Sequence, residues 1–263
     1  MSAIVKELYY YPIKSFRGLR ADQLWLDKQG PLYDRQFVLV DDKDNFLTQR
    51  QMPELAKIGL RMLDESFIEL SANEHGEMDF GLNEHEAKTE EVTVWKRKFA
   101  AEEVNTDVSD WLSEVTKKKV RLMRMKDGAG YEFDPEKHPG RTMRFNDNKP
   151  ILVISTASLK MLEQKAGVTL TMSRFRPNIV VDGVEAHAED TWTQFSIGRI
   201  KFDGLHACSR CKITTVHPLT GEVGDEPLKT LATYRRDDNG VNFGFYFAHL
   251  NEGKIEAGAT ITL

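Results

Sequence analysis

The chain has 263 residues, of which 40% are hydrophobic and 29% are charged, a composition typical of a globular protein and not of a disordered or fibrous one. Its formal net charge of −5 gives no basic footprint for nucleic acid, so we expect no nucleic-acid partner. Charged residues interrupt residues 1–7, where a signal peptide would be apolar, and no apolar run reaches the roughly 18 residues that a membrane helix needs. We therefore expect a cytoplasmic protein without a membrane partner.

The first hundred residues alternate short β-rich runs with turn-forming segments. The runs cover residues 4–11, 36–40, 67–70 and 92–95, which predicts antiparallel sheet. Between Thr106 and Thr116, apolar residues recur at helical spacing behind Thr106 as the expected cap. This pattern predicts one amphipathic helix near the boundary between two domains, which we expect to span residues 1–100 and 101–263.

A basic stretch follows the predicted helix. It contains Lys117, Lys118, Lys119, Arg121, Arg124 and Lys126. The favoured interpretation is a solvated helix end that runs into an edge strand, because lysine on an edge strand discourages unwanted pairing. The alternative is a docking patch for an acidic electron-transfer partner.

The second half of the chain combines a long connection, many strands and few helices. Residues 127–149 have no clear periodicity, and connections of that length are usually functional or disordered. A buried strand is predicted at 150–154, followed by a helix that begins after Ser155 and Thr156 and ends at Gly167. A short helix is predicted at 228–234, and further strands at 178–181, 195–202, 213–216, 242–247 and 259–263. Many strands and few helices favour an α+β fold built around a β-barrel.

The two cysteines, Cys208 and Cys211, allow three interpretations. A zinc site would need further ligands such as His206 and His217, whose spacing matches no familiar zinc pattern. A thioredoxin-like pair normally opens a helix in a βαβ unit, whereas this pair lies between predicted strands late in the chain. The third interpretation is a thiolate ligand to a soft metal, favoured by the positive side chains on either side of Cys211. With so few cysteines, a reducing compartment is expected.

Several motifs next to predicted strands decide between these interpretations. They are YPIKSFRG at 11–18, DR at 34–35, TQRQ at 48–51, RFRPN at 174–178, CSRCKITTV at 208–216 and PLTG at 218–221. In this order and spacing they resemble the MOSC-domain family with an amino-terminal MOSC β-barrel domain. The likeness extends through EDTW at 189–192, EPLKTL at 226–231 and FGFYF at 243–247, and it is greatest to the mitochondrial amidoxime reducing component and its bacterial relatives.

The resemblance implies a fold and a set of site residues. The fold is α+β, a mainly antiparallel β-barrel MOSC domain with a smaller β-rich amino-terminal lobe. Cys211 matches the family's catalytic cysteine and protein ligand to molybdenum, so Cys208 is not a ligand. The cofactor-binding positions of the family match Lys14, Ser15, Arg35, Arg176, Asn178, Ser209, Arg210 and Tyr246. Charge agrees with this, because a cofactor with a terminal phosphate needs cations and amide donors.

The implied activity is that of a molybdenum-cofactor (molybdopterin with molybdenum) oxidoreductase that reduces N-hydroxylated small molecules, converting N–OH to N–H with loss of water. Several bacterial relatives carry a plant-type ferredoxin domain after the barrel, and this chain has no such cysteine run. We therefore expect a separate electron donor, which would be a reductase, a ferredoxin or a flavodoxin-like protein. Two alternatives stay open: a non-catalytic carrier of the cofactor or sulfur-transfer module, and a thiol redox protein that uses Cys208 and Cys211 as a dithiol.

Overall fold

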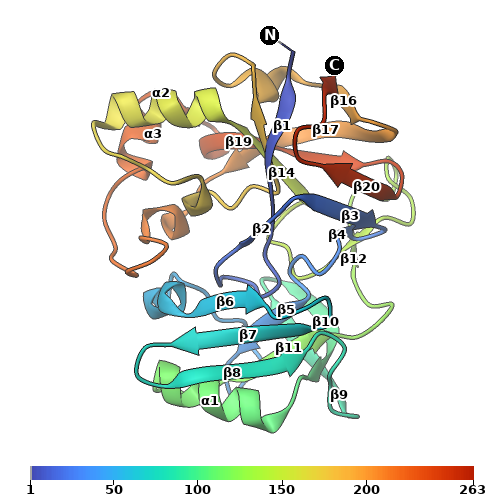
Figure 1. The fold of residues 1–263 in the computed structure, drawn as a ribbon, viewed down its shortest axis with the longest axis vertical. Helices are drawn as coiled ribbons and strands as arrows, with labels where there is room; N and C mark the ends of the chain where they lie inside the picture. The colour runs from blue at the N-terminus through green and yellow to red at the C-terminus, as the bar shows by residue number, and fades with distance from the viewer. Residues whose placement is uncertain (1) are drawn as a thin grey trace.

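The computed structural model describes residues 2–263 and has two lobes, one above the other in Figure 1. The upper lobe holds the beginning of the described chain, the carboxyl terminus and helices α2 and α3. The lower lobe is formed by the light blue, cyan and green segments and carries helix α1. The two lobes match the β-rich organisation expected from the sequence.

A nine-stranded sheet forms most of the upper lobe, in the order β2-β1-β15-β14-β19-β17-β16-β21, with β18 paired to β19. Among the described strands of this sheet, only β14 and β15 pair in parallel, and their crossover contains α2. The strands are β1 (Ile4–Tyr10), β2 (Leu19–Ala21), β14 (Ile151–Ser155), β15 (Ile179–Asp182), β16 (Gln194–Ile197), β17 (Ile200–Ser209), β18 (Arg236–Asp237), β19 (Gly240–His249) and β21 (Ile261–Thr262).

The sheet curls back toward its own beginning. The Val5 amide donates to the Ala259 carbonyl at 2.9 Å, and the Ile261 amide donates to the Ala3 carbonyl at 2.9 Å. These bonds join the start of β1 to the segment that leads into β21. The enclosed core is apolar, with Phe195 and Phe202 stacked at 4.5 Å between ring centroids. The predicted mainly antiparallel α+β fold is therefore confirmed.

Helices α2 (Thr156–Ala166) and α3 (Leu228–Tyr234) form where the sequence predicts them, and both pack on the upper sheet. The Ser155 hydroxyl accepts a hydrogen bond from the Ser158 amide at 3.0 Å and caps α2. Gly167 ends this helix in the left-handed conformation at φ +66°, which glycine adopts without strain. Leu162 and Leu231 bury the helices against a second apolar cluster.

The lower lobe contains two sheets and one amphipathic helix. Its strands are β5 (Phe37–Val40), β9 (Thr89–Val94), β10 (Arg97–Glu103) and β11 (Arg121–Met125) in one sheet, and β6 (Gly59–Met62), β7 (Phe67–Ala72) and β8 (Gly76–Gly81) in the other. Helix α1 (Thr106–Thr116) packs on β11 and β8. Its cap is Asn105 and not Thr106 as predicted, because the Asn105 side chain accepts from the Val108 amide at 2.7 Å.

The structure also contains two small sheets. One pairs β20 (Gly253–Glu256), β3 (Gln23–Asp27) and β4 (Gly30–Pro31), and the other pairs β12 (Tyr131–Glu132) with β13 (Thr142–Met143). The second lies inside the long connection 127–149. Residue 100, the expected end of the first domain, lies within β10, which pairs with β9 and β11 on its two sides. We propose that the domain boundary follows β11 instead.

Two predicted strands differ from the structure. Residues 195–202 form the hairpin of β16 and β17, because Gly198 turns the chain at φ +57°. Residues 213–216 are not a strand but the short 3-10 helix η4 (Lys212–Thr215) and its cap. The Thr214 hydroxyl donates to the Cys211 carbonyl at 3.0 Å, and such a local bond competes with strand pairing. The other 3-10 helices are η1 (Pro53–Lys57), η2 (Met172–Arg174) and η3 (Ala188–Thr191).

None of the helices in residues 2–263 combines the length and the apolar composition that a membrane crossing requires.

The buried side chain of His249 on β19 predicts a pH dependence of stability. Its Nε2 lies 2.5 Å from the Asp27 carbonyl oxygen, and burial lowers the pKa of His249 to about 4. The unfolded chain binds a proton here below about pH 6.5, and the folded chain binds it only near its lowered pKa. The free energy of unfolding should therefore fall by about 2 kcal/mol between pH 7 and pH 5.

Urea unfolding of the wild type and of His249→Gln at these two pH values checks this expectation. Glutamine stays neutral at both, so the variant should lose about 2 kcal/mol less over the interval. An equal loss in the two proteins would contradict the assignment.

Candidate functional site

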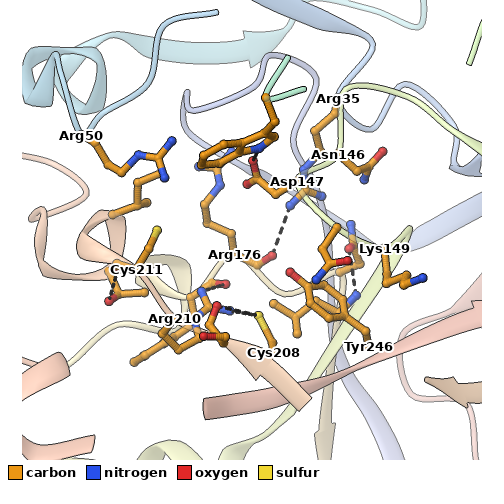
Figure 2. A pocket seen from close by; sticks show the side chains of 18 of the residues that line it. Arg35, Arg50, Asn146, Asp147, Lys149, Arg176, Cys208, Arg210, Cys211 and Tyr246 are labelled. Carbon is orange, nitrogen blue, oxygen red and sulfur yellow. Dashed lines mark hydrogen bonds between the residues drawn. The ribbon is translucent and has the colours of Figure 1, made fainter. Parts of the chain in front are cut away.

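A cavity of about 460 Å³ lies between the two lobes. The lower lobe, the end of the connection 127–149, and strands β14, β17 and β19 all contribute to its wall (Figure 2). Of the nine residues singled out from the sequence, seven line it: Arg35, Arg176, Asn178, Ser209, Arg210, Cys211 and Tyr246. The fold therefore brings segments from both halves of the chain to one place.

The two cysteines of this cavity have different environments. Cys208, near the end of β17, is buried, and its Sγ accepts a hydrogen bond from Arg210 Nη1 at 2.7 Å. Cys211 lies just after the strand, immediately before η4, and is exposed. Both thiols are free. The exposed sulfur is thus available to a ligand in the cavity, while the buried sulfur serves a local hydrogen bond.

No cluster of three or more His, Cys, Asp or Glu side chains that could hold a metal ion occurs in the described part of the chain. His217, one of the two histidines considered for zinc, instead accepts at Nδ1 from the amides of Leu219 and Thr220. His206 lies with its ring centroid 5.4 Å from that of Tyr246. A metal held here by Cys211 would need ligands that the protein does not supply.

Two arginines from different lobes meet at one aromatic ring. The Cζ atoms of Arg35 and Arg176 lie 4.4 and 4.2 Å from the centroid of the Tyr11 ring. Both arginines have left-handed backbone conformations, at φ +52° and +58°, which non-glycine residues seldom adopt. Arg35 also pairs with the buried carboxylate of Asp34 at 2.5 Å. The chain thus tolerates local strain to hold two guanidinium groups in the cavity wall.

Three buried polar atoms of the wall have no hydrogen-bond partner within residues 2–263: Arg176 Nη2, Arg210 Nε and Asn146 Oδ1. An unpaired buried donor is costly, so such atoms indicate a site for a ligand or water. Burial and the nearby Arg35 lower the pKa of Arg176 to about 10, so it remains charged at neutral pH. The two free guanidinium donors fit an anionic group such as a phosphate.

Lys14 and Ser15 are not among the lining residues, unlike the other predicted positions. Lys14 is buried behind the wall, and its Nζ donates to Asp147 Oδ1 at 2.6 Å and to the Phe145 carbonyl at 2.8 Å. Burial lowers the pKa of Lys14, and Asp147 opposes that shift. The buried Ser15 has φ +68°, and its carbonyl accepts from Gln49 at 2.7 Å. In this structure both residues support the wall.

Asp147 is the carboxylate of the cavity lining. Desolvation raises the pKa of Asp147. The charge and hydrogen bond of the Lys14 ammonium lower it, as does the hydrogen bond that Trp95 Nε1 donates at 3.0 Å, and together they outweigh desolvation. The net result is a pKa well below the usual range, so Asp147 stays ionised near neutral pH. Its role is therefore to fix Lys14 and Trp95 and not to donate a proton.

Asn178, Ser209 and Tyr246 complete the predicted set. The Asn178 side chain is fully engaged, since it accepts from the Leu152 amide at 3.2 Å and donates to the Tyr9 carbonyl and to Asp34 at 3.2 Å each. Ser209 is exposed beside the cysteine loop. Burial and then Cys208 raise the pKa of Tyr246 well above its ordinary value, so its phenol keeps its proton.

Sequence reasoning missed other lining residues that are charged, aromatic or amide-bearing. They are Arg50, Trp95, Arg97, Asn146, Asp147, Asn148, Lys149 and Phe175. The length of the connection 127–149 predicts that it is functional or disordered, and its residues 146–149 line the cavity. Arg50 belongs to the TQRQ motif, which is one of the motifs that carry the resemblance to the MOSC-domain family. Trp95 and Arg97 belong to the β9–β10 hairpin, and no sequence motif marks them as site residues.

The basic stretch after α1 is not near this cavity. Arg121 forms ion pairs with Asp44, Glu90 and Glu103, so its charge is already neutralised. Helix α1 lies at the end of the lower lobe away from the upper lobe (Figure 1). None of residues 117–126 lines the cavity, and Lys117, Lys118 and Lys119 are exposed, so the docking patch for an acidic partner stays a prediction.

Comparison with known families agrees with this architecture. Residues 2–119 match the MOSC N-terminal beta barrel domain, and residues 140–262 match the MOSC domain. Together these matches cover both lobes. The chain belongs to the MOSC-domain family.

Particular relatives cover nearly all of the chain. Mitochondrial amidoxime-reducing component 1 of Mus musculus is 30% identical over 98% of this chain and 82% of its own length. The protein of the same name from Homo sapiens is 28% identical, with the same coverage of 98% and 82%. Molybdenum cofactor sulfurase of Solanum lycopersicum is 29% identical over 95% of this chain, which spans 34% of that relative's length.

Among solved structures, the YuaD protein of Bacillus subtilis aligns with 99% of this chain and 94% of its own, at a TM-score of 0.47 and 13% sequence identity.

Proposed function

We propose that this chain is a molybdenum-cofactor-dependent reductase of N-hydroxylated compounds that receives its electrons from a separate donor protein. Relatives named amidoxime-reducing component and molybdenum cofactor sulfurase support a role in binding the molybdenum cofactor. The observation that carries the proposal is the meeting of an exposed thiol with unpaired guanidinium donors in one cavity. The first suits a soft metal and the second a phosphate.

Different residues of the cavity would hold different groups of such a cofactor. Cys211 would bind the metal, and Arg176 and Arg210 would hold the phosphate and polar groups of the pterin. When bound, the cofactor supplies the two-electron chemistry by which R–NHOH, two electrons and two protons give R–NH2 and water. Arg35 adds positive charge to the wall and is itself held by Asp34.

The residues of the chain also set the polarity around the reacting group. Tyr246 keeps its proton and is available as a neutral hydrogen-bond donor, because burial and Cys208 raise its pKa. Arg210 ties the buried Cys208 to the Phe175 carbonyl, with bonds of 2.7 and 2.6 Å from its two terminal nitrogens. This bracing fixes the loop that presents Cys211.

A non-catalytic carrier or sulfur-transfer module is the second candidate, because relatives named cofactor sulfurase share the same domains. Such a module would bind the cofactor but would not reduce an N-hydroxylated compound with any reductant. A dithiol mechanism has less support, because Cys208 is buried in a hydrogen bond while Cys211 is exposed. Two free thiols are consistent with the proposed reducing, cytoplasmic location.

The proposal predicts that the purified protein does not oxidise NADH or NADPH by itself. The sequence has no Gly-x-Gly-x-x-Gly motif and no iron–sulfur cysteine run to bring electrons in. We expect reduction of an amidoxime only when an artificial low-potential donor or a separate reductase is added. Consumption of NADPH with an amidoxime and no added donor would refute the separate-donor claim.

A further inference from the structure

Three cations of the cavity each lie over an aromatic ring. The Cζ of Arg50 is 4.4 Å from the Trp95 ring centroid, the Cζ of Arg97 is 4.1 Å from that of Tyr131, and the Nζ of Lys149 is 5.3 Å from that of Phe133. We call Arg50, Arg97 and Lys149 the cationic rim. They come from three separate segments: the loop before η1, the start of β10 and the end of the connection 127–149.

The aromatic partners hold these cations without neutralising them. Within residues 2–263, no side chain of the rim forms an ion pair with a carboxylate, whereas Arg35 deeper in the wall is paired with Asp34. An aromatic face orients a guanidinium group at little cost and leaves its N–H groups free. The rim is therefore positively charged and preorganised.

Two cations of the rim, Arg50 and Arg97, lie at the solvent side of the cavity. Trp95 is 44% exposed and Tyr131 is 39% exposed, so the cations stacked on them sit at the entrance. Figure 2 shows Arg50 and Cys211 on the same side of the cavity, with Arg176 between them and the opposite wall.

The charge of the lining exceeds what one phosphate needs. Six cations line the cavity, Arg35, Arg50, Arg97, Lys149, Arg176 and Arg210, and Asp147 is the lining carboxylate. The inner arginines, Arg176 and Arg210, already offer unpaired N–H donors for a phosphate. The three rim cations are not needed for that phosphate and are available to a second anionic group.

We propose that the cationic rim binds a carboxylate or phosphate group carried by the substrate, so that the chain selects anionic N-hydroxylated compounds. This proposal rests on the proposed function and names its substrate class. The rim lines a cavity and does not protrude from the surface, which suits a small anion better than an acidic protein. Charge-assisted bonds from two arginine forks also orient the ligand while its N–OH group points inward.

The test compares two matched compounds with the cofactor-loaded protein: benzamidoxime with a para-carboxylate, and benzamidoxime with a para-carboxamide. Titration calorimetry gives the dissociation constants, and turnover with an artificial donor gives KM. We expect the wild type to bind the carboxylate at least about tenfold more tightly. Arg50→Gln and Arg97→Gln should each remove most of that preference and leave the carboxamide unchanged, and rising salt should weaken only the carboxylate.

Arg199→Gln is the matched control, because Arg199 is exposed in the β16–β17 turn and lines no part of the cavity. An equal effect on both compounds, or a preference unchanged in both rim variants, would overturn the proposal. If Arg50→Gln loses molybdenum and pterin, the rim binds the cofactor. If the rim variants raise only the KM for a donor protein, the rim binds that protein. Either result overturns the substrate assignment. Preferential binding without turnover would uphold the anion site and refute the reductase function.

Discussion

Replacing Cys211 by serine is expected to reduce the proposed amidoxime-reducing activity to background. Cys211 is the exposed thiol of the cavity, placed beside the guanidinium groups by the end of β17. A hydroxyl is a harder and far less acidic donor than a thiol, and it is a poor ligand for a soft metal site. Turnover of benzamidoxime with an artificial low-potential donor measures the effect.

Cys208→Ser is the matched control and should retain much of the activity. Cys208 is buried and accepts a hydrogen bond from Arg210, which a serine hydroxyl can also accept. Molybdenum content should therefore fall in the Cys211 variant alone. Equal loss of activity in the two variants would favour a dithiol mechanism and contradict the assignment of Cys211 as the ligand.

Replacing Arg176 by alanine is expected to lower cofactor retention about ten- to a hundredfold. Arg176 presents a buried Nη2 with no partner in the described chain, and it is held over Tyr11 beside Arg35. Losing a charge-assisted hydrogen bond to a phosphate costs about 1.5–3 kcal/mol, which corresponds to this range of affinity. Molybdenum and pterin per protein after gel filtration give the measurement.

Arg17→Ala serves as the comparison, because Arg17 donates to the carbonyls of Ala56 and Lys57 and does not line the large cavity. Its cofactor content should stay close to that of the wild type. Arg176→Lys should fall between the two, since lysine keeps the charge and loses the planar fork. Wild-type cofactor content in Arg176→Ala would remove Arg176 from the site.

The elements predicted well from the sequence are those with strong local signals. Helix α2 has a serine cap, an apolar face and a terminal glycine, and all three act as expected in the structure. The run 213–216 is rich in β-branched residues and yet forms a 3-10 turn, because threonine side chains bond to the preceding backbone. Local propensity cannot reveal that competition, and it also missed the short strands whose pairing depends on distant segments.

The site residues likewise divide into those that a sequence motif marks and those that only the fold reveals. The motifs around Arg35, Arg176 and Cys211 stand next to strands, and the fold brings these three residues to the wall of one cavity. Lys14 is buried and bonded to Asp147, which no local pattern indicates, and its contact with the cofactor stays a prediction. Trp95 reaches the site through the β9–β10 hairpin, and its contact with Asp147 joins residues 52 positions apart. Only the folded chain reveals such neighbours.

Metal and pterin analysis of the purified protein, made in a host that synthesises the molybdenum cofactor, tests the central claim most directly. The account predicts about one molybdenum and one pterin per chain, both retained in Cys208→Ser, with molybdenum lost from Cys211→Ser. Protein that is folded and monodisperse but contains neither molybdenum nor pterin, even after incubation with the free cofactor, would contradict it.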